Sequence, residues 1–292
     1  MSDKKLTSLL EIINYSAGLL KENNIKDARL NIELMFCEIL KCDRIKLYLD
    51  FDKPLKQEEI AGFKAMLKRR LNHEPLQYIL GKTNFYGCNL LLNNKVLIPR
   101  QETEILVGKV LEDVFESGKE NVRILEIGSG SGCIAIALSS EMKKKNILHN
   151  IVSIDNSTDS ISISNENMKL NNISDENINF KVIDYLKDDM SDNKFDYIVS
   201  NPPYIPSGNL PDLDAEVKNY EPVDALTDGK DGLLFYEIIF NLCKSSYSDS
   251  KIFLEIGDGQ KNKIEELLNN LNIRNFRYFK DYNKIDRVLK IN

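Results

Sequence analysis

The chain has 292 residues, of which 42% are hydrophobic and 29% are charged, so collagen-like, disordered and disulfide-scaffold proteins are excluded. Its formal net charge of −6 disfavours a protein that coats nucleic acid through the phosphates. The 5 cysteines form no C-x-x-C pair and there are only 2 histidines, which disfavours zinc and fits a reducing compartment. We expect a cytoplasmic protein with no metal site, no membrane span and no secretion signal.

Residues 6–72 carry apolar side chains at helical spacing and no alternating pattern typical of strands, which predicts a small helical bundle. We assign this bundle to residues 1–75, which end at Pro75. They carry 14 basic and 12 acidic side chains, a net charge of only +2. Residues 76–99 are of extended type and are broken by glycines, which predicts a hairpin linker.

The remaining segment, residues 100–292, alternates strands and helices after a helix predicted at 103–115. Predicted strands lie at 122–127, 151–154, 178–183, 195–200, 251–256, 275–279 and 287–291. Predicted helices lie at 133–140, 158–171, 233–247 and 260–271. This alternation is typical of an α/β fold with a seven-stranded, Rossmann-like sheet. Because only a short turn separates the last two strands, we expect a mostly parallel sheet with an antiparallel last strand.

A glycine-rich loop, Glu126-Ile127-Gly128-Ser129-Gly130-Ser131-Gly132, follows the first of these strands and opens a helix. A plain turn does not need three glycines at this position, where α/β sheets bind nucleotide-like ligands. The dinucleotide fingerprint would place Gly or Ala where this chain has Cys133, and Glu126 would repel a pyrophosphate. Glu126 instead suits a cationic ligand such as S-adenosylmethionine, which carries a sulfonium and an ammonium group and no phosphate.

Two further strand ends carry candidate cofactor-binding side chains. Asp155 can accept hydrogen bonds from both ribose hydroxyls, and it can also cap the following helix. Asp184 can face the exocyclic amine of adenine, and Tyr185 can stack on the adenine ring. A surface turn is an equally good interpretation of Asp184.

The motif Asn201-Pro202-Pro203-Tyr204 directly follows the fourth strand. The two prolines fix φ and lack N–H groups, which leaves rigid carbonyls that face outward. A planar NH2 group can donate its two protons to the Asn201 side-chain oxygen and the Pro202 carbonyl, while Tyr204 stacks on it. This arrangement aims the nitrogen lone pair at a methyl group and offsets the charge that develops, so no strong base is needed.

The glycine loop and the Asn-Pro-Pro-Tyr motif together resemble class I S-adenosylmethionine-dependent methyltransferases that act on planar nitrogen. The flanking motifs resemble more specifically the peptide chain release factor glutamine N5-methyltransferases, the HemK/PrmC family. These motifs are Glu74-Pro75-Leu76-Gln77-Tyr78-Ile79, Phe85-Tyr86-Gly87, Leu97-Ile98-Pro99-Arg100-Gln101-Glu102-Thr103-Glu104, Tyr220-Glu221-Pro222 and Glu255-Ile256-Gly257 with Gln260. In this chain Gln101 replaces the usual proline, and Tyr185 replaces the tryptophan of some members.

The resemblance implies methyl transfer from S-adenosylmethionine to the side-chain amide nitrogen of the glutamine in the Gly-Gly-Gln motif of release factors. S-adenosylhomocysteine would be the product. The family pattern places the cofactor at Gly128–Gly132, Asp155, Tyr185 and Asn201, and the substrate glutamine at Asn201–Tyr204. We expect a monomer whose partners are release factors, without direct contact to nucleic acid or membrane, and with a helical bundle that helps to recognise the substrate.

Three other functions stay open on the sequence. Asn-Pro-Pro-Tyr serves the N6 nitrogen of adenine equally well, but an enzyme on DNA or RNA must extract a base from its stack and is expected to carry a basic recognition region. Glutamine methylation of a ribosomal protein is the second alternative. A catalytically inactive binding module is the third, and the intact glycine loop, Asp155 and Asn201 argue against it.

Overall fold

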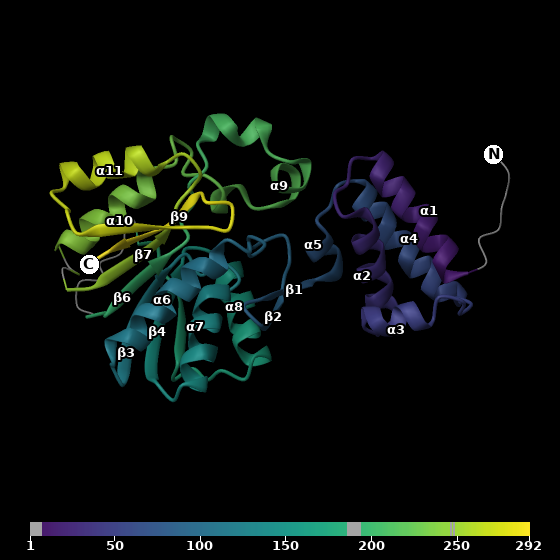
Figure 1. Cartoon of the computed structure of the whole chain (residues 1–292), viewed down its shortest axis with the longest axis horizontal. Helices are drawn as coiled ribbons and strands as arrows, with labels where there is room; N and C mark the ends of the chain where they lie inside the picture. The colour runs from purple at the N-terminus through teal and green to yellow at the C-terminus, as the bar shows by residue number, and fades with distance from the viewer. Residues whose placement is uncertain (1–7, 186–193, 246, 248) are drawn as a thin grey trace. The chain divides into compact units, whose positions relative to one another are not determined.

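The computed structural model describes residues 8–185, 194–245, 247 and 249–292, which form two compact units (Figure 1). The helical unit contains the chain up to Gly81 together with the segment Asp214–Tyr220. The sheet unit contains Lys82–Leu213 and Glu221–Asn292. Leu6, where the predicted helical pattern begins, lies outside the described residues.

The helical unit confirms the predicted bundle over its described part. Its helices are α1 (Leu9–Glu22), α2 (Ala28–Leu40), α3 (Arg44–Leu49), α4 (Gln57–Leu71), α5 (Leu76–Leu80) and α9 (Ala215–Tyr220). Ser8 begins α1 with a capping box, in which its side chain accepts from the Glu11 N–H. The stacked rings of Phe36 and Phe63, 4.2 Å between centroids, join α2 to α4 in the core.

Helix α9 belongs to this unit although it follows β6 in the sequence. Its Glu216 accepts a hydrogen bond from Arg70 at 2.6 Å, and the Arg70 side chain is almost fully buried. The hydroxyl of Tyr220 donates to the backbone carbonyl of Asn72 at 2.7 Å. The sequence analysis predicted no helix at this position.

The predicted extended character of Tyr78 and Ile79 is wrong, because both residues lie in α5. Pro75 has φ −55°, which is preset for the start of a helix, and its carbonyl accepts from the N–H groups of both residues. Gly81 ends the helix in the left-handed conformation, with φ 70°. The hairpin itself is confirmed further along, as β1 (Lys82–Phe85) and β2 (Cys88–Leu91).

The sheet unit alternates strands and helices as predicted. Its helices are α6 (Thr103–Ser117), α7 (Cys133–Lys144), α8 (Thr158–Leu170), α10 (Leu234–Ser245) and α11 (Lys261–Asn270). Its main strands are β3 (Asn121–Ile127), β4 (Leu148–Asp155), β5 (Ile178–Val182), β6 (Tyr197–Ser200), β7 (Lys251–Glu255), β8 (Phe276–Lys280) and β9 (Asp286–Ile291). Two short 3-10 turns, Ser207–Asp212 and Val223–Ala225, follow β6 and were not predicted.

The strand order is β5-β4-β3-β6-β7-β9-β8, in which β9 is antiparallel to both of its neighbours and the other pairs are parallel. This confirms the predicted seven-stranded sheet with an antiparallel last strand. Helices α6, α7 and α8 cover one face, and α10 and α11 cover the other (Figure 1). Successive residues of β3 serve opposite faces, since Ile124 belongs to the first core and Leu125 to the second.

The β1–β2 hairpin packs within the sheet unit, where Asn167 of α8 forms two hydrogen bonds with the backbone of Leu91. The same side chain donates to the Ser131 carbonyl at 2.9 Å, so it joins the hairpin to the glycine loop. As functional domains, the segments 1–75, 76–99 and 100–292 stay a prediction. No helix in the described part of the chain is long and apolar enough to cross a membrane.

Candidate active site

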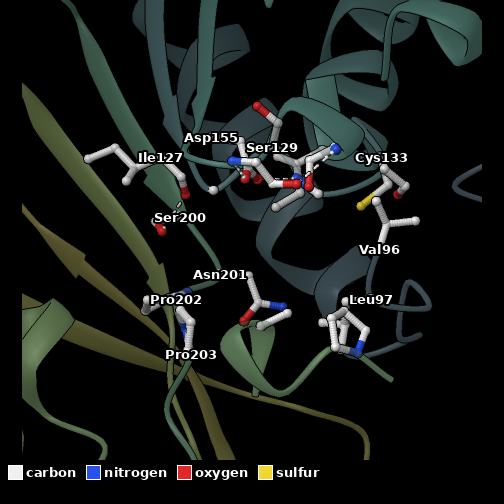
Figure 2. A pocket seen from close by; sticks show the side chains of 18 of the residues that line it. Val96, Leu97, Ile127, Ser129, Cys133, Asp155, Ser200, Asn201, Pro202 and Pro203 are labelled. Carbon is white, nitrogen blue, oxygen red and sulfur yellow. Dashed lines mark hydrogen bonds between the residues drawn. The ribbon is translucent and has the colours of Figure 1, made fainter. Parts of the chain in front are cut away.

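A cavity of about 220 Å³ lies at the carboxyl ends of β3, β4 and β6, where the topology predicts a ligand site (Figure 2). It brings together most of the predicted site residues. Those that line it are Gly128, Ser129, Gly130, Ser131, Asp155, Tyr185, Asn201, Pro202 and Pro203. The other predicted residues, Glu126, Gly132, Asp184 and Tyr204, do not line it.

The glycine loop adopts a backbone that side chains would disturb. Gly128, Gly130 and Gly132 all have positive φ, at 86°, 53° and 79°. A Cβ atom added at Gly128 or Gly130 would meet no atom within 4 Å, so both leave open space beside the backbone. A Cβ at Gly132 would lie 3.0 Å from the Phe180 ring, so this glycine serves packing instead.

Asp155 is held at the end of β4 by two backbone donors. Gly130 N–H donates to its Oδ2 and Ser157 N–H to its Oδ1, both at 2.9 Å. Burial raises the pKa of Asp155 above its ordinary value, and these two hydrogen bonds oppose the shift. The Ser160 side chain is a third donor to this carboxylate, which still keeps acceptor capacity for a ligand hydroxyl. The alternative role of Asp155 as the cap of the following helix is wrong. Ser157 is the N-cap of α8, and its side chain accepts from the Ser160 N–H.

Glu126 lies completely buried beside the loop rather than in the cavity wall. The Ser153 hydroxyl donates to its Oε2, and the Ser153 and Ser129 hydroxyls are 2.7 Å apart. Burial raises the pKa of Glu126 to about 8. Within the described residues, Glu126 Oε1 and the Ser131 hydroxyl have no hydrogen-bond partner. Unpaired buried polar atoms are costly, and Ser131 lines the cavity, so its hydroxyl favours a polar ligand there.

Two aromatic side chains border the cavity, Tyr185 after β5 and Phe235 in α10. The rings of Tyr185 and Phe235 lie 5.9 Å apart at 43°, and both residues line the cavity. Burial raises the pKa of Tyr185 above its ordinary value, so the phenol stays neutral. Asp184 is half-buried and lies outside the cavity wall, and its contact with an adenine amine stays a prediction.

The Asn-Pro-Pro-Tyr loop leaves the sheet where the Ser200 hydroxyl donates to the Ile127 carbonyl at 2.7 Å, joining the ends of β6 and β3. Asn201 is half-buried, and its Nδ2 donates to the Thr103 hydroxyl at 3.2 Å. Tyr204 does not line the cavity, and its hydroxyl donates to Glu255 Oε1, at the end of β7, at 3.3 Å. The predicted stacking of Tyr204 on substrate stays a prediction.

Several residues that support the loop were not predicted as part of the site. Gln260 Nε2 donates to the Tyr204 carbonyl at 2.8 Å, and Thr103 Oγ1 donates to Glu255 Oε2 at 2.7 Å. Arg100 bonds to Glu221 at 2.5 Å, so the stretch before α6 is fixed to the segment after α9. These residues all lie in the quoted motifs, but their pairing across more than 50 positions is a product of the fold.

Two known families match the chain: the PrmC N-terminal domain over residues 11–81 and a methyltransferase domain over residues 118–248. Release factor glutamine methyltransferases of Fusobacterium nucleatum, Thermodesulfovibrio yellowstonii and Geobacter sulfurreducens are 38%, 37% and 33% identical to it. The matches cover 96%, 98% and 99% of this chain, and 77%, 97% and 98% of those proteins. The chain belongs to the release factor glutamine methyltransferase family.

The fold of this member of the release factor glutamine methyltransferase family also occurs in a human methyltransferase 10 domain containing protein. The two structures have a TM-score of 0.50 at 15% identity, over 70% of this chain and 90% of the other. This likeness concerns the fold alone.

S-adenosylmethionine is the methyl donor of this release factor glutamine methyltransferase family member, and the residues present fit it. Gly128 and Gly130 leave space beside the backbone, and the Asp155 carboxylate keeps acceptor capacity for a ribose hydroxyl. Tyr185 offers an aromatic face, and Ser131 adds a hydroxyl to the cavity wall. The cavity therefore presents a carboxylate acceptor and an apolar face to the ribose and the adenine of the cofactor.

We expect Asp155→Ala to weaken binding of S-adenosylhomocysteine by about 1–3 kcal/mol, roughly 5–150-fold, because hydrogen bonds to a charged acceptor are lost. Isothermal titration measures the dissociation constant. Asp175→Ala, at an exposed position between α8 and β5, is the matched control and is expected to bind normally. An unchanged dissociation constant for Asp155→Ala would exclude the ribose role.

Proposed function

We propose that this chain methylates the side-chain amide nitrogen of the glutamine in the Gly-Gly-Gln motif of peptide chain release factors. The observation that carries the proposal is that Asn201 and Pro202 line the same cavity as Gly128 and Asp155, so an acceptor pair for an NH2 group lies beside the cofactor site. The substrate class rests on the relatives, which are named release factor glutamine methyltransferases across almost the whole chain.

The chemistry assigned to the chain is positioning and electrostatic stabilisation. When bound, S-adenosylmethionine supplies the methyl group as an electrophile. The side-chain oxygen of Asn201 and the carbonyl of Pro202 accept the two amide protons of the substrate, which fixes the nitrogen and stabilises the positive charge that develops on it. Pro202 and Pro203 have no N–H group, so neither residue offers a backbone donor that could compete with the substrate NH2 group for these two acceptors. Both acceptors are neutral, so the proton that is lost passes to water.

The helical unit is proposed to contribute to the grip on a folded release factor. None of its described residues lines the cavity, and residues 11–81 match the PrmC N-terminal domain. Binding energy from contacts far from the reacting group can be used to orient that group. We propose that contacts between the helical unit and the release factor orient the substrate glutamine in this way. The monomeric state, the cytoplasmic location and the lack of nucleic-acid binding stay predictions.

The decisive experiment incubates the full-length protein with labelled S-adenosylmethionine and an intact release factor. We expect label on the glutamine of Gly-Gly-Gln, located by peptide mass spectrometry, and kcat/KM at least about tenfold higher than for a free Gly-Gly-Gln peptide, because the peptide lacks the remote contacts. A factor with that glutamine replaced by alanine is the control and is expected to take up no label.

Two results would contradict the proposal. Preferential label on DNA or RNA in parallel reactions would favour the adenine alternative, and preferential label on a ribosomal protein would favour the other glutamine substrate. Equal efficiency on the peptide and the intact factor would instead remove the recognition role of the helical unit.

A further inference from the structure

A buried hydrogen-bond chain extends from the catalytic motif to the end of β7. Asn201 Nδ2 donates to Thr103 Oγ1 at 3.2 Å, and the Thr103 hydroxyl donates to Glu255 Oε2 at 2.7 Å. The second oxygen of Glu255 accepts from the Tyr204 hydroxyl at 3.3 Å. One carboxyl group therefore supports both ends of the Asn-Pro-Pro-Tyr motif, directly at Tyr204 and through Thr103 at Asn201.

The inner members of this hydrogen-bond chain, Glu255 and Thr103, are shielded from solvent. Glu255 is 1% exposed and Thr103 is 2% exposed, and they belong to different elements, β7 and the start of α6. Burial raises the pKa of Glu255 to about 7, while the Thr103 hydrogen bond and the Arg287 charge oppose the shift. A buried carboxyl group costs stability unless its oxygens are satisfied, so its presence behind the motif calls for a role.

The direction of the hydrogen bonds follows from the chemistry of the three groups. The Thr103 and Tyr204 hydroxyls and the Arg287 charge all favour the ionised form of Glu255, and in that form the carboxylate only accepts, so Thr103 directs its single proton to Glu255. The Thr103 oxygen is then left as an acceptor, and an acceptor can be matched only by the NH2 end of the Asn201 carboxamide. The oxygen end of that carboxamide is left for the cavity, and in Figure 2 it points to the side of Pro202 and Pro203.

We propose that Glu255 is a positioning residue that acts through Thr103 to hold the Asn201 carboxamide with its oxygen towards the substrate. This inference rests on the proposed function, because it requires a substrate NH2 group that donates to that oxygen. If the carboxamide turned over, its own NH2 group would face the substrate NH2 group, and two donors would oppose each other.

The first test compares two substitutions that keep side-chain size, Glu255→Gln and Thr103→Val, with Thr103→Ser as the control. In Glu255→Gln, the new NH2 group can donate to Thr103, which frees the Thr103 proton for the Asn201 oxygen and favours the wrong orientation. We expect kcat on a saturating release factor to fall about tenfold or more, the scale of one oriented hydrogen bond, with KM and the dissociation constant for S-adenosylhomocysteine changed less than about threefold. We expect Thr103→Val to lower kcat by a similar factor. Thr103→Ser keeps the hydroxyl, so its kcat is expected to stay within about threefold of that of the parent.

The second test separates positioning from a merely structural role. In an Asn201→Ala background there is no carboxamide to orient, so Glu255→Gln is expected to cost no further activity in single-turnover reactions. Affinity for the release factor in the presence of S-adenosylhomocysteine, measured without turnover, is expected to stay close to that of the parent in Glu255→Gln. Three results would each overturn the inference. Glu255→Gln could cost a further tenfold in the Asn201→Ala background, Glu255→Gln alone could keep full activity, or Thr103→Ser could lose turnover as Thr103→Val does.

The parent enzyme, assayed in parallel, keeps the two hypotheses apart. If the parent does not methylate the release factor at glutamine, the proposed function fails, and the inference fails with it. If the parent methylates it and Glu255→Gln is equally fast, only the positioning role is wrong.

Discussion

Asn201→Ala is expected to lower kcat for methylation of a release factor by roughly 10²-fold or more, the size of the loss when a preorganised polar contact in an active site is removed. The reason is geometric: Asn201 supplies one of two acceptors for the substrate NH2 group, and without it the amide can rotate and its lone pair is no longer aimed. The side chain is half-buried and makes one hydrogen bond, to Thr103, so its contribution to folding is small.

Thermal unfolding and steady-state kinetics check this prediction together. The melting temperature and the affinity for S-adenosylhomocysteine are expected to change little in Asn201→Ala. Asn209→Ala, at an exposed position in the turn after the motif, is the control and is expected to turn over like the parent. Comparable turnover of Asn201→Ala and the parent would show that this side chain does not position the substrate.

Gly232→Ala is expected to disrupt the catalytic loop from a distance, with a loss of kcat that we also place at roughly 10²-fold, since a misplacement of about 1 Å is enough. Gly232 has φ 79°, and a Cβ atom there would lie 2.1 Å from the Tyr204 carbonyl oxygen and 2.8 Å from its carbon. Both are backbone atoms, so no side-chain rotation relieves the clash and the loop must move. The strained backbone alone costs about 1–3 kcal/mol of stability.

Gly229→Ala supplies the matched control for this substitution. Gly229 has a nearly equal φ of 75°, but a Cβ atom there would meet nothing within 4 Å. Gly229→Ala therefore carries the same backbone strain without the clash, and we expect it to unfold at a lower temperature but to keep its turnover. Equal kinetics for the two variants would show that the Gly232 contact does not position Tyr204.

Much of the sheet unit could be predicted because its signals are local. The strands are short runs rich in apolar residues, helices α7, α8 and α11 begin soon after β3, β4 and β7, and the glycine loop lies directly at the end of β3. The chemistry of Asn201 and Pro202 could be predicted for the same reason, since an acceptor pair on a rigid backbone is a property of adjacent residues. No knowledge of distant contacts was needed for either.

The supporting residues could not be predicted, because their roles depend on pairs far apart in the sequence. Thr103 and Glu255 are separated by 152 positions, and neither sequence environment signals a buried partner. Helix α5 was missed because Tyr78 and Ile79 have strand-type side chains, whereas Pro75 and Gly81 determine the local backbone. The contact of Glu216 with Arg70, across 146 positions, was missed in the same way.

The helical unit is assembled from two separate stretches of chain, so it cannot be detached by cutting one peptide bond. The polypeptide passes from one unit to the other three times, after Gly81, after Leu213 and after Tyr220. A protease that nicks the chain after Gly81 leaves α9 bound to the bundle through the Arg70–Glu216 pair and the Tyr220 hydroxyl. We expect these contacts to hold the nicked fragments together under native conditions, and a genetic deletion of the bundle would remove the partners of α9. The two units are thus built from alternating stretches of one chain, so neither is a simple terminal module.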